Sequence, residues 1–409
     1  MRSERILLLA PPAEDEYDPG LRQGVAEPPL GLLYLWSALE RCSPSPEVRI
    51  IDAYVEPTRM DDLEATIRTY GCTQLWVSLM STEGVRCLGD RVSEIRSSIP
   101  QLKLVAGGAF FRKLPEPDLS RFQTDYDLIV IGDADLEVET ILKGKGVHRC
   151  KPLPSYLELP YPKRASLPLD EYAGDSPPRH VVIGARGCAG NCAFCAISTP
   201  RPYLRQPREV TLEMRTLFEK TAVPFYSLID DVMSLWPDRF ADYERHFRQF
   251  PEGMWLDVPW RVDRFSDEIA DRLAACGVNI VRFGVESIDP DTQNLLGKSF
   301  SKDEVRKAVK CCESRSISPC LYFMFGFAHE TEETIAELID FMAELGTETR
   351  VPPYLGIVRI LPGTRLASVY RENGWMNGGV PRRGVPLPRL LEVLDDWRST
   401  HSTPLEKEV

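Results

Sequence analysis

Residues 184–196 read Gly-Ala-Arg-Gly-Cys-Ala-Gly-Asn-Cys-Ala-Phe-Cys-Ala and place Cys188, Cys192 and Cys195 at the spacing C-x3-C-x2-C. The run follows an apolar segment, residues 180–183, that is typical of a buried strand. Because the glycines and the asparagine between the cysteines favour turns, we expect a tight loop directly after this strand. Three thiolates on one loop can hold three irons of a cubane iron–sulfur cluster and leave the fourth iron open.

The cysteine spacing also fits two other structures. Offsets of 0, 4 and 7 residues lie on one face of a helix, where the thiols would be buried core side chains. A zinc site is the second alternative, but it normally needs a fourth Cys or His close by, usually in a second paired motif. The glycines argue against the helix, and no second pair stands nearby. The cluster is therefore the favoured interpretation.

The motif resembles that of the radical S-adenosylmethionine (radical SAM) superfamily. In that family the open iron chelates the amino and carboxylate groups of SAM, and an electron from the cluster cleaves SAM to methionine and a 5′-deoxyadenosyl radical. The resemblance implies a [4Fe–4S] cluster and SAM as cofactors. It also makes Cys188, Cys192 and Cys195 both the metal ligands and the catalytic residues.

Composition sets the frame for this interpretation. A chain of 409 residues is too long for one ordinary core and suggests two domains. The net charge of −12, without a lysine- or arginine-dense run, disfavours a nucleic-acid partner. Nothing resembles a membrane span or a cleaved signal peptide. Eleven cysteines without a regular framework fit a reducing compartment, so we expect a cytoplasmic protein.

Residues 1–145 alternate between short apolar runs and amphipathic stretches. Expected helices lie at 31–41, 59–70 and 83–98, and expected strands at 5–9, 48–52, 74–78, 102–106 and 127–131. This alternation predicts an α/β, Rossmann-like, doubly wound parallel sheet, which binds ligands at the carboxyl ends of its strands. Residues 146–179 are rich in proline and are predicted to be a linker.

The order of loops in this first domain looks like that of the cobalamin-binding domain that precedes the barrel in one class of the superfamily. The cobalt-ligating D-x-H-x-x-G motif of some other cobalamin enzymes is absent, so no histidine from that motif would ligate cobalt. A degenerate, empty domain is the alternative. The resemblance implies cobalamin as a cofactor, with contacts from Pro12, Ser78, Ser81, Thr82, Gly107, Gly108 and Gly132.

The alternation resumes at residue 180 and continues to about residue 370. The expected strands lie at 181–183, 225–229, 254–258, 280–283, 320–324 and 354–358. Six strands match the partial (β/α)6 TIM-type barrel of the superfamily, in which function lies at the carboxyl strand ends. Residues 371–409, with an amphipathic stretch at 387–397, are predicted to form a small C-terminal cap.

The resemblance also implies SAM-binding positions, and elementary chemistry offers each an alternative. Phe194 could pack near the adenine or only anchor the loop. Asp230 could accept from the SAM ammonium or cap a helix. Arg261 could hold the SAM carboxylate or form an internal salt bridge. Glu286 and Ser287 follow the fourth expected strand of the barrel. Because a carboxylate at a strand end is costly unless it is paired, a ligand role is favoured for them. Gly326, after the fifth expected strand, is the remaining implied position.

A barrel behind such a domain resembles the cobalamin-dependent methyltransferases of unactivated carbon. One SAM would supply the methyl group and a second the radical, with a flavodoxin or ferredoxin as reductant. The acceptor is expected to be a peptide or protein residue, as in members that modify methyl-coenzyme M reductase, or a small molecule. Two alternatives remain: a radical SAM enzyme without cobalamin that catalyses dehydration, cyclisation or rearrangement, and an iron–sulfur electron carrier.

Overall fold

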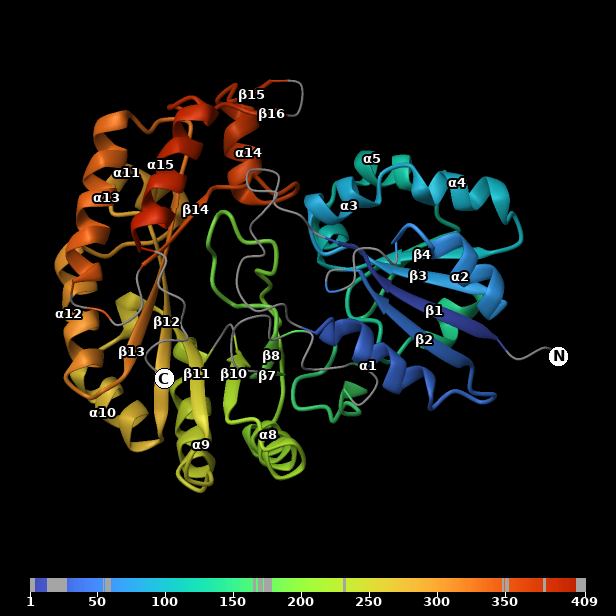
Figure 1. Cartoon of the computed structure of the whole chain (residues 1–409), viewed down its shortest axis with the longest axis horizontal. Helices are drawn as coiled ribbons and strands as arrows, with labels where there is room; N and C mark the ends of the chain where they lie inside the picture. Colours follow the sequence, from blue (N-terminus) through green and yellow to red (C-terminus); the bar gives the residue numbers. More distant parts are fainter. Residues whose placement is uncertain are drawn as a thin grey trace. The chain divides into compact units, whose positions relative to one another are not determined.

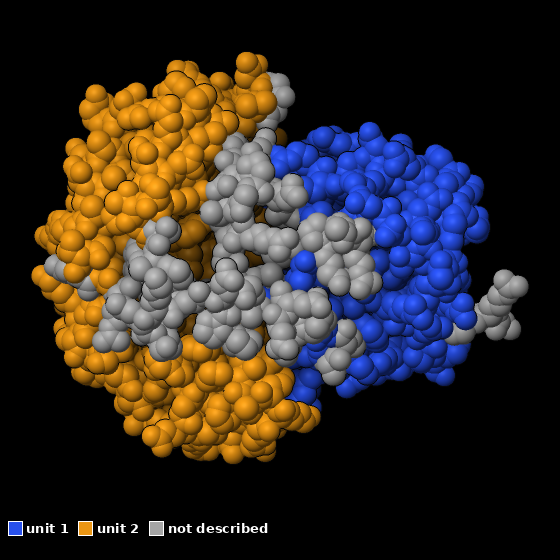
Figure 2. Space-filling model, in the orientation of Figure 1, with its two compact units in different colours: residues 1–174 blue, residues 175–409 orange. Residues whose placement is uncertain are grey.

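The chain divides into two compact units, residues 1–174 and 175–409 (Figure 2). The computed structural model describes residues 4–12, 28–53, 55, 60–164, 167, 172, 179–230, 233–347, 349, 353–377 and 380–401. Unit 1 contains the first predicted sheet and unit 2 contains the second (Figure 1). The α/β fold class with two parallel sheets is confirmed.

Unit 1 is built on one six-stranded parallel sheet with the order β2-β1-β3-β4-β5-β6. Its strands are β1 (Arg5–Ala10), β2 (Glu47–Asp52), β3 (Gln74–Ser78), β4 (Lys103–Gly107), β5 (Leu128–Ile131) and β6 (Gly146–Arg149). Its helices are α1 (Leu30–Leu39), α2 (Leu63–Tyr70), α3 (Thr82–Leu88), α4 (Arg91–Ser98), α5 (Glu116–Leu119) and α6 (Val138–Lys143), with short 3-10 turns η2 (Ala109–Lys113) and η3 (Ser120–Phe122). The strand order reverses between β1 and β3, which is where doubly wound sheets bind ligands.

Both faces of this sheet are buried, as its apolar strands require. Leu7 and Leu9 pack into one core with Leu75 and Val77. Ile6 and its alternating neighbours pack into a second core on the opposite face. Side chains alternate between the two faces of a strand, so a continuous apolar run fills both layers.

Two local expectations for unit 1 differ from the structure. The stretch 146–179 is not all linker, because residues 146–149 form β6, and Tyr172 donates a hydrogen bond to Asp52 at 2.7 Å. The single helix expected at 83–98 is two helices, because Gly89 has a φ of 51° that ends α3. A residue with a positive φ cannot continue a right-handed helix, so the chain restarts at α4.

Unit 2 is built on a second six-stranded parallel sheet, in the sequential order β7-β10-β11-β12-β13-β14. These strands are β7 (Arg179–Ile183), β10 (Phe225–Ile229), β11 (Trp255–Trp260), β12 (Val278–Glu286), β13 (Ser318–Phe325) and β14 (Tyr354–Ile357). The connecting elements are α8 (Pro207–Thr221), η5 (Met233–Leu235), α9 (Pro237–Phe247), η6 (Val262–Arg264), α10 (Asp267–Ala275), α11 (Pro290–Leu296), α12 (Lys302–Glu313) and α13 (Glu332–Gly346). The sequential order is that of an open half-barrel (Figure 1).

The half-barrel has one apolar face and one mixed face. In β13 every second residue is buried, and the intervening side chains are partly exposed. Asp257 and Arg282 lie among the partly exposed positions of β11 and β12, where Arg282 Nε donates to Asp257 Oδ1 at 2.7 Å. The buried set packs beneath the helices, so the other face is left for ligands.

The C-terminal residues belong to unit 2. After β14 come α14 (Arg365–Glu372), a short hairpin of β15 (Met376–Asn377) and β16 (Val380–Pro381), and α15 (Leu387–His401). Trp397 of α15 is buried and donates to the carbonyl of Pro353 at 3.1 Å. Among the described residues, no helix is long and apolar enough to cross a membrane.

Candidate active site

The predicted SAM-binding residues all follow strands of the second sheet at its carboxyl edge. The cysteine loop follows β7, Asp230 follows β10, Arg261 follows β11, and Glu286 ends β12. Gly326 follows β13. The sheet therefore gathers residues that lie up to about 140 positions apart in sequence, and this edge is where barrels carry out their chemistry.

The cysteine loop is a loop, as predicted, and distant segments hold it. A two-stranded ribbon of β8 (Ala185–Arg186) and β9 (Tyr203–Leu204) closes its base. The amide of Ala193 donates to the carbonyl of Leu296 at the end of α11, and the amide of Leu366 in α14 donates to the carbonyl of Ala193, both at 2.8 Å. Three separate elements thus fix the loop, which excludes the alternative of a helix with buried thiols.

The loop fits a cubane cluster better than a single ion. All three cysteines are partly exposed, and the amide of Gly190 lies 3.3 Å from Cys188 Sγ. Such N–H contacts to sulfur tune protein-bound clusters. Within the described residues, these three sulfur atoms do not converge to within 4.8 Å of one another, which one metal ion would require. Three ligands on three different irons are naturally wider apart.

Arg261 reaches the cysteine loop. Its Nη1 lies 3.8 Å from Cys192 Sγ, while Nε and Nη2 donate to the two carboxylate oxygens of Asp263 at 2.9 and 2.8 Å. The hydrogen bonds to Asp263 raise the pKa of Arg261. The structure therefore shows the internal salt bridge that the sequence allowed, and contact with SAM stays a prediction.

Asp230 lies in a buried ion pair. Its carboxylate is 0 % exposed and accepts from Arg239 Nη2 at 2.8 Å, and Arg239 also donates to the carbonyl of Gly184 at 2.8 Å. A charge this deep is tolerated only because it is paired. The pair secures the turn at Gly184, where β7 ends and the cysteine loop begins. Its place points to a supporting role, and the bond to the SAM ammonium stays a prediction.

Glu286 and Phe194 are brought together by a residue that the sequence analysis did not identify, Lys298. Lys298 Nζ lies 2.9 Å from Glu286 Oε1 and 5.8 Å from the centroid of the Phe194 ring. Glu286 has a φ of 68°, an uncommon conformation for a residue with a side chain. Such local strain is typical of functional positions. Next to it, the carbonyl of Ser287 accepts a hydrogen bond from the side-chain amide of Gln293.

Gly326 is held by a carboxylate that the sequence analysis also missed. Glu330 Oε2 accepts from the amides of Gly326 at 2.5 Å and Phe327 at 2.9 Å. Arg383 donates to the carbonyl of Gly326 at 2.9 Å. Because Gly326 has a φ of 93° and a Cβ there would lie 2.9 Å from Arg383 Nη1, only glycine fits. The backbone that is predicted to run beside adenine is thereby fixed in position.

In unit 1, the residues predicted to contact cobalamin lie at the carboxyl edge of one sheet. Pro12 follows β1, Ser78 ends β3, and Ser81 and Thr82 begin α3. The others are Gly107 and Gly108 at the end of β4 and Gly132 after β5. Ser81 also accepts from the amide of Gly84 as a helix cap, at 3.3 Å. The edge therefore has the expected placement, and each contact with a corrin stays a prediction.

Two large apolar side chains near this edge in sequence are exposed, Met80 at 64 % and Leu136 at 58 %, and are available to an apolar ligand. Gly108 has a φ of 109°, and a Cβ there would lie 2.2 Å from the carbonyl oxygen of Leu79, so the close approach to the Leu79 backbone requires glycine at this point. The histidine of unit 1, His148, is hydrogen-bonded to Glu137 at 2.8 Å.

The second unit is thus a parallel half-barrel with a three-cysteine loop after its first strand. This combination of fold and loop indicates the class of barrel enzymes that bind an iron–sulfur cluster. Residues 182–342 match the model of the Radical SAM superfamily. Its members use a [4Fe–4S] cluster and SAM, in agreement with the sequence analysis.

Relatives in two organisms are named methyltransferases. The chain is 28% identical over 399 residues to an uncharacterised methyltransferase of Pyrococcus horikoshii, covering 90% of this chain and 83% of the relative. It is 27% identical over 277 residues to bacteriochlorophyllide d C-8(2)-methyltransferase of Chlorobaculum tepidum, covering 61% of this chain and 58% of the relative.

Solved structures share the fold of both units. The radical SAM methyltransferase TsrM of Kitasatospora setae, with tryptophan and a SAM analogue bound, aligns with a TM-score of 0.70 at 20% identity, over 91% of this chain and 76% of TsrM. The cobalamin-dependent SAM radical enzyme OxsB, with aqua-cobalamin and SAM bound, aligns with a TM-score of 0.69 at 14% identity, over 98% of this chain and 67% of OxsB. These likenesses confirm the predicted combination of folds.

Proposed function

We propose that the protein is a cobalamin-dependent radical SAM enzyme that methylates an unactivated carbon atom. The observation that carries the proposal is the anchored loop of Cys188, Cys192 and Cys195 at the carboxyl edge of a half-barrel, in a chain that also contains a doubly wound unit. The relative that aligns over 90% of the chain, named a methyltransferase, supports the transferred group.

In this proposal the cluster and SAM bind at the carboxyl edge of the sheet in unit 2, and cobalamin binds at the carboxyl edge of the sheet in unit 1. When bound, the cluster and SAM supply a carbon-centred radical on the substrate, and cobalamin supplies the methyl group. Cys188, Cys192 and Cys195 hold the cluster, and Glu286 with Ser287 bind the polar part of SAM. The backbone at Gly326 binds the adenine. Since these cofactors carry the chemistry, the protein's own task is to orient the reactants and exclude water.

The acceptor we propose is a side-chain carbon of an amino acid residue in a peptide. Support comes from the presence of tryptophan as substrate in the TsrM structure with the same fold. A tetrapyrrole is the second candidate, because the bacteriochlorophyllide methyltransferase of Chlorobaculum tepidum is a relative. A flavodoxin or ferredoxin would supply the electrons.

Anaerobic reconstitution with iron, sulfide and hydroxocobalamin tests the cofactors. After desalting, metal analysis should find about four irons and about one cobalt per chain. Cys192→Ala should lose the iron and SAM cleavage, whereas Cys87→Ala, a partly exposed cysteine of unit 1, should keep both. Four irons without cobalt would remove cobalamin from the proposal and favour a rearrangement or cyclisation.

Methyl transfer is then followed with SAM carrying a deuterated methyl group. Peptide libraries, free amino acids and tetrapyrroles are incubated separately with the reconstituted enzyme and a reductant, and mass spectrometry records label incorporation. Label in peptides but not in tetrapyrroles supports the proposed acceptor. Label in tetrapyrroles alone contradicts it while leaving the methyltransferase assignment intact.

A further inference from the structure

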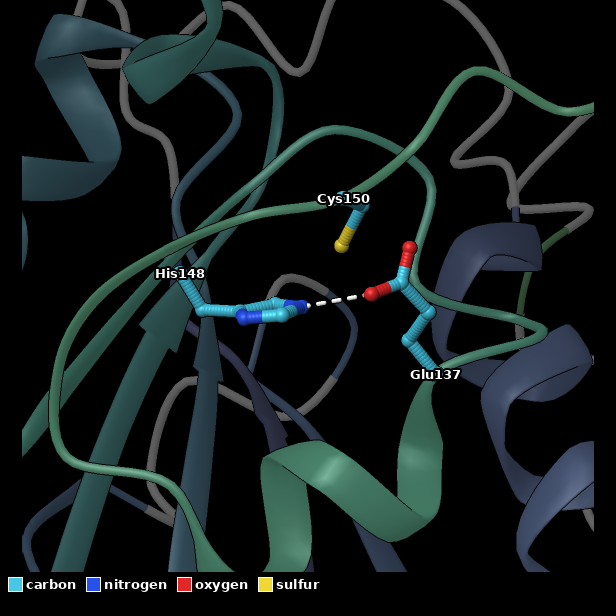
Figure 3. A group of neighbouring side chains, drawn as sticks. All are labelled: Glu137, His148 and Cys150. Carbon is cyan, nitrogen blue, oxygen red and sulfur yellow. Dashed lines mark hydrogen bonds and ion pairs between the residues drawn. The ribbon is translucent and has the colours of Figure 1, made fainter.

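Unit 1 contains a second group of metal-ligating side chains, Glu137, His148 and Cys150. Glu137 precedes α6, His148 lies in β6, and Cys150 directly follows that strand. One ligand atom from each lies within 4.8 Å of the other two. Figure 3 shows the three side chains pointing toward one another from two different segments. The donors are a carboxylate oxygen, an imidazole nitrogen and a thiol sulfur.

Hydrogen bonds hold the carboxylate of Glu137 and the backbone of Cys150 in place. The amide of Lys151 donates to Glu137 Oε1 at 2.7 Å, which turns Oε2 toward His148 Nε2 at 2.8 Å. The amide of Cys150 donates to the carbonyl of Ile131 at 2.9 Å, continuing the pairing of β5 with β6. Ligands fixed by outer contacts of this kind are typical of metal sites.

Acidic groups surround the three side chains. Asp133 and Asp135 lie near Cys150, and the nearby guanidinium of Arg112 is paired with Asp133 at 2.7 Å. These acidic surroundings favour a cation.

We propose that Glu137, His148 and Cys150 form a zinc site whose fourth position is taken by water. Zinc accepts nitrogen, sulfur and oxygen donors together, and three protein ligands with one open position are a known arrangement for it. The side chains of His148 and Glu137 are 24 % and 18 % exposed, which leaves access for the metal and for water. The bound metal would tie the segment before α6 to the end of β6.

The competing explanation is a Glu–His hydrogen bond with a thiol beside it by chance, and metal binding separates the two. The full-length protein, with its cluster reconstituted, is dialysed against zinc and then against a weak chelator. Metal analysis should find one zinc per chain besides the iron. Cys150→Ala and His148→Gln should lose that zinc and keep the iron, which also reports that they are folded. Cys72→Ala, another partly exposed cysteine of unit 1, should retain both metals.

X-ray absorption at the zinc edge identifies the ligands. The proposed site predicts a single sulfur at about 2.3 Å with nitrogen or oxygen at about 2.0–2.1 Å. Three sulfurs would place the zinc on the cysteine loop and would overturn the proposal. The proposal is also wrong if the wild type retains no zinc, or if Cys150→Ala retains as much zinc as the wild type.

Discussion

Arg261 Nη1 lies 3.8 Å from the sulfur of Cys192, while the rest of its guanidinium group is paired with Asp263. A cation beside a cluster ligand stabilises the reduced, more negative cluster, because local charge sets the reduction potential of such centres. Arg261→Met should therefore make the midpoint potential of the bound cluster more negative by some tens of millivolts. An EPR-monitored redox titration of the reconstituted protein measures this shift.

A variant of Asp263 should shift the midpoint potential in the opposite direction. Asp263→Asn removes the anion that partly neutralises Arg261, so its midpoint potential should move in the positive direction. Shifts of the same sign in both variants would show that loop disorder, and not charge, controls the potential.

The Lys298–Glu286 pair should matter for both stability and SAM. Lys298→Met leaves the carboxylate of Glu286, whose side chain is 12 % exposed, without its cation, a change that typically costs about 3–5 kcal/mol. Under the proposed function, Glu286 also binds SAM, so its displacement should raise the KM for SAM in the cleavage assay. Lys302→Met is the control, because Lys302 pairs with Glu337 on the surface at 3.7 Å and should change stability by less than about 1 kcal/mol. An unchanged KM in Lys298→Met would separate Glu286 from SAM binding.

The buried pair of Asp230 and Arg239 should support the cysteine loop. Asp230→Asn strands the Arg239 guanidinium, and a loss of about 3–5 kcal/mol is expected. For a unit of this size each kcal/mol lowers the midpoint of thermal unfolding by about 2–4 °C, so calorimetry should show a drop of about 6–20 °C. Because Arg239 also holds the carbonyl of Gly184, iron retention should fall as well.

Asp238→Asn is the control for this pair, since Asp238 lies exposed in the first turn of α9, the helix that also carries Arg239. It should leave both the unfolding temperature and the iron content close to wild type. If the Asp230→Asn protein is as stable as wild type but does not cleave SAM, direct contact between Asp230 and SAM is favoured instead.

The sequence predicted what depends on short-range pattern. Apolar runs located five of the six strands of unit 1 and the six strands of the half-barrel to within a few residues, because a run of apolar residues is visible in neighbouring positions of the sequence. The loop of Cys188, Cys192 and Cys195 was recognised for the same reason. The strand β6 was missed because Gly146–Arg149 has only four residues and carries polar side chains.

Partners that come from distant positions could not be predicted in this way. Lys298, Arg239 and Glu330 each complete a pair or a bonding group whose geometry depends on how the strands and helices are folded together. Nothing in their local sequence marks them. For Asp230 the sequence offered a bond to SAM or a helix cap, and the ion pair with Arg239 is visible only in the fold.

Glu330 should make stability depend on pH near neutrality. Burial raises its pKa to about 7, against the two backbone amides and Arg383, which act to lower it. Since the pKa is higher in the folded protein than in the unfolded chain, the stabilising contribution is complete below about pH 4.5 and is lost as the pH rises to about 7. The pKa of Glu330 differs by about 2.5 between the folded and the unfolded state, which corresponds to a change in the free energy of unfolding on the order of 3 kcal/mol. Glu330→Gln stays neutral, so its melting temperature relative to wild type should rise from pH 5 to 7 and then level off.

Scanning fluorimetry between pH 5 and 8.5 measures this difference, and Glu333→Gln, three residues further along in the first turn of α13, provides the control. Glu333 is exposed, and a hydrogen bond from Thr331 lowers its pKa, so its own contribution changes only below the range tested. The difference between Glu333→Gln and wild type should therefore be flat. If the Glu330→Gln difference is equally flat, the carboxylate is already ionised at pH 5, and the amides of Gly326 and Phe327 are then bonded to a full charge throughout.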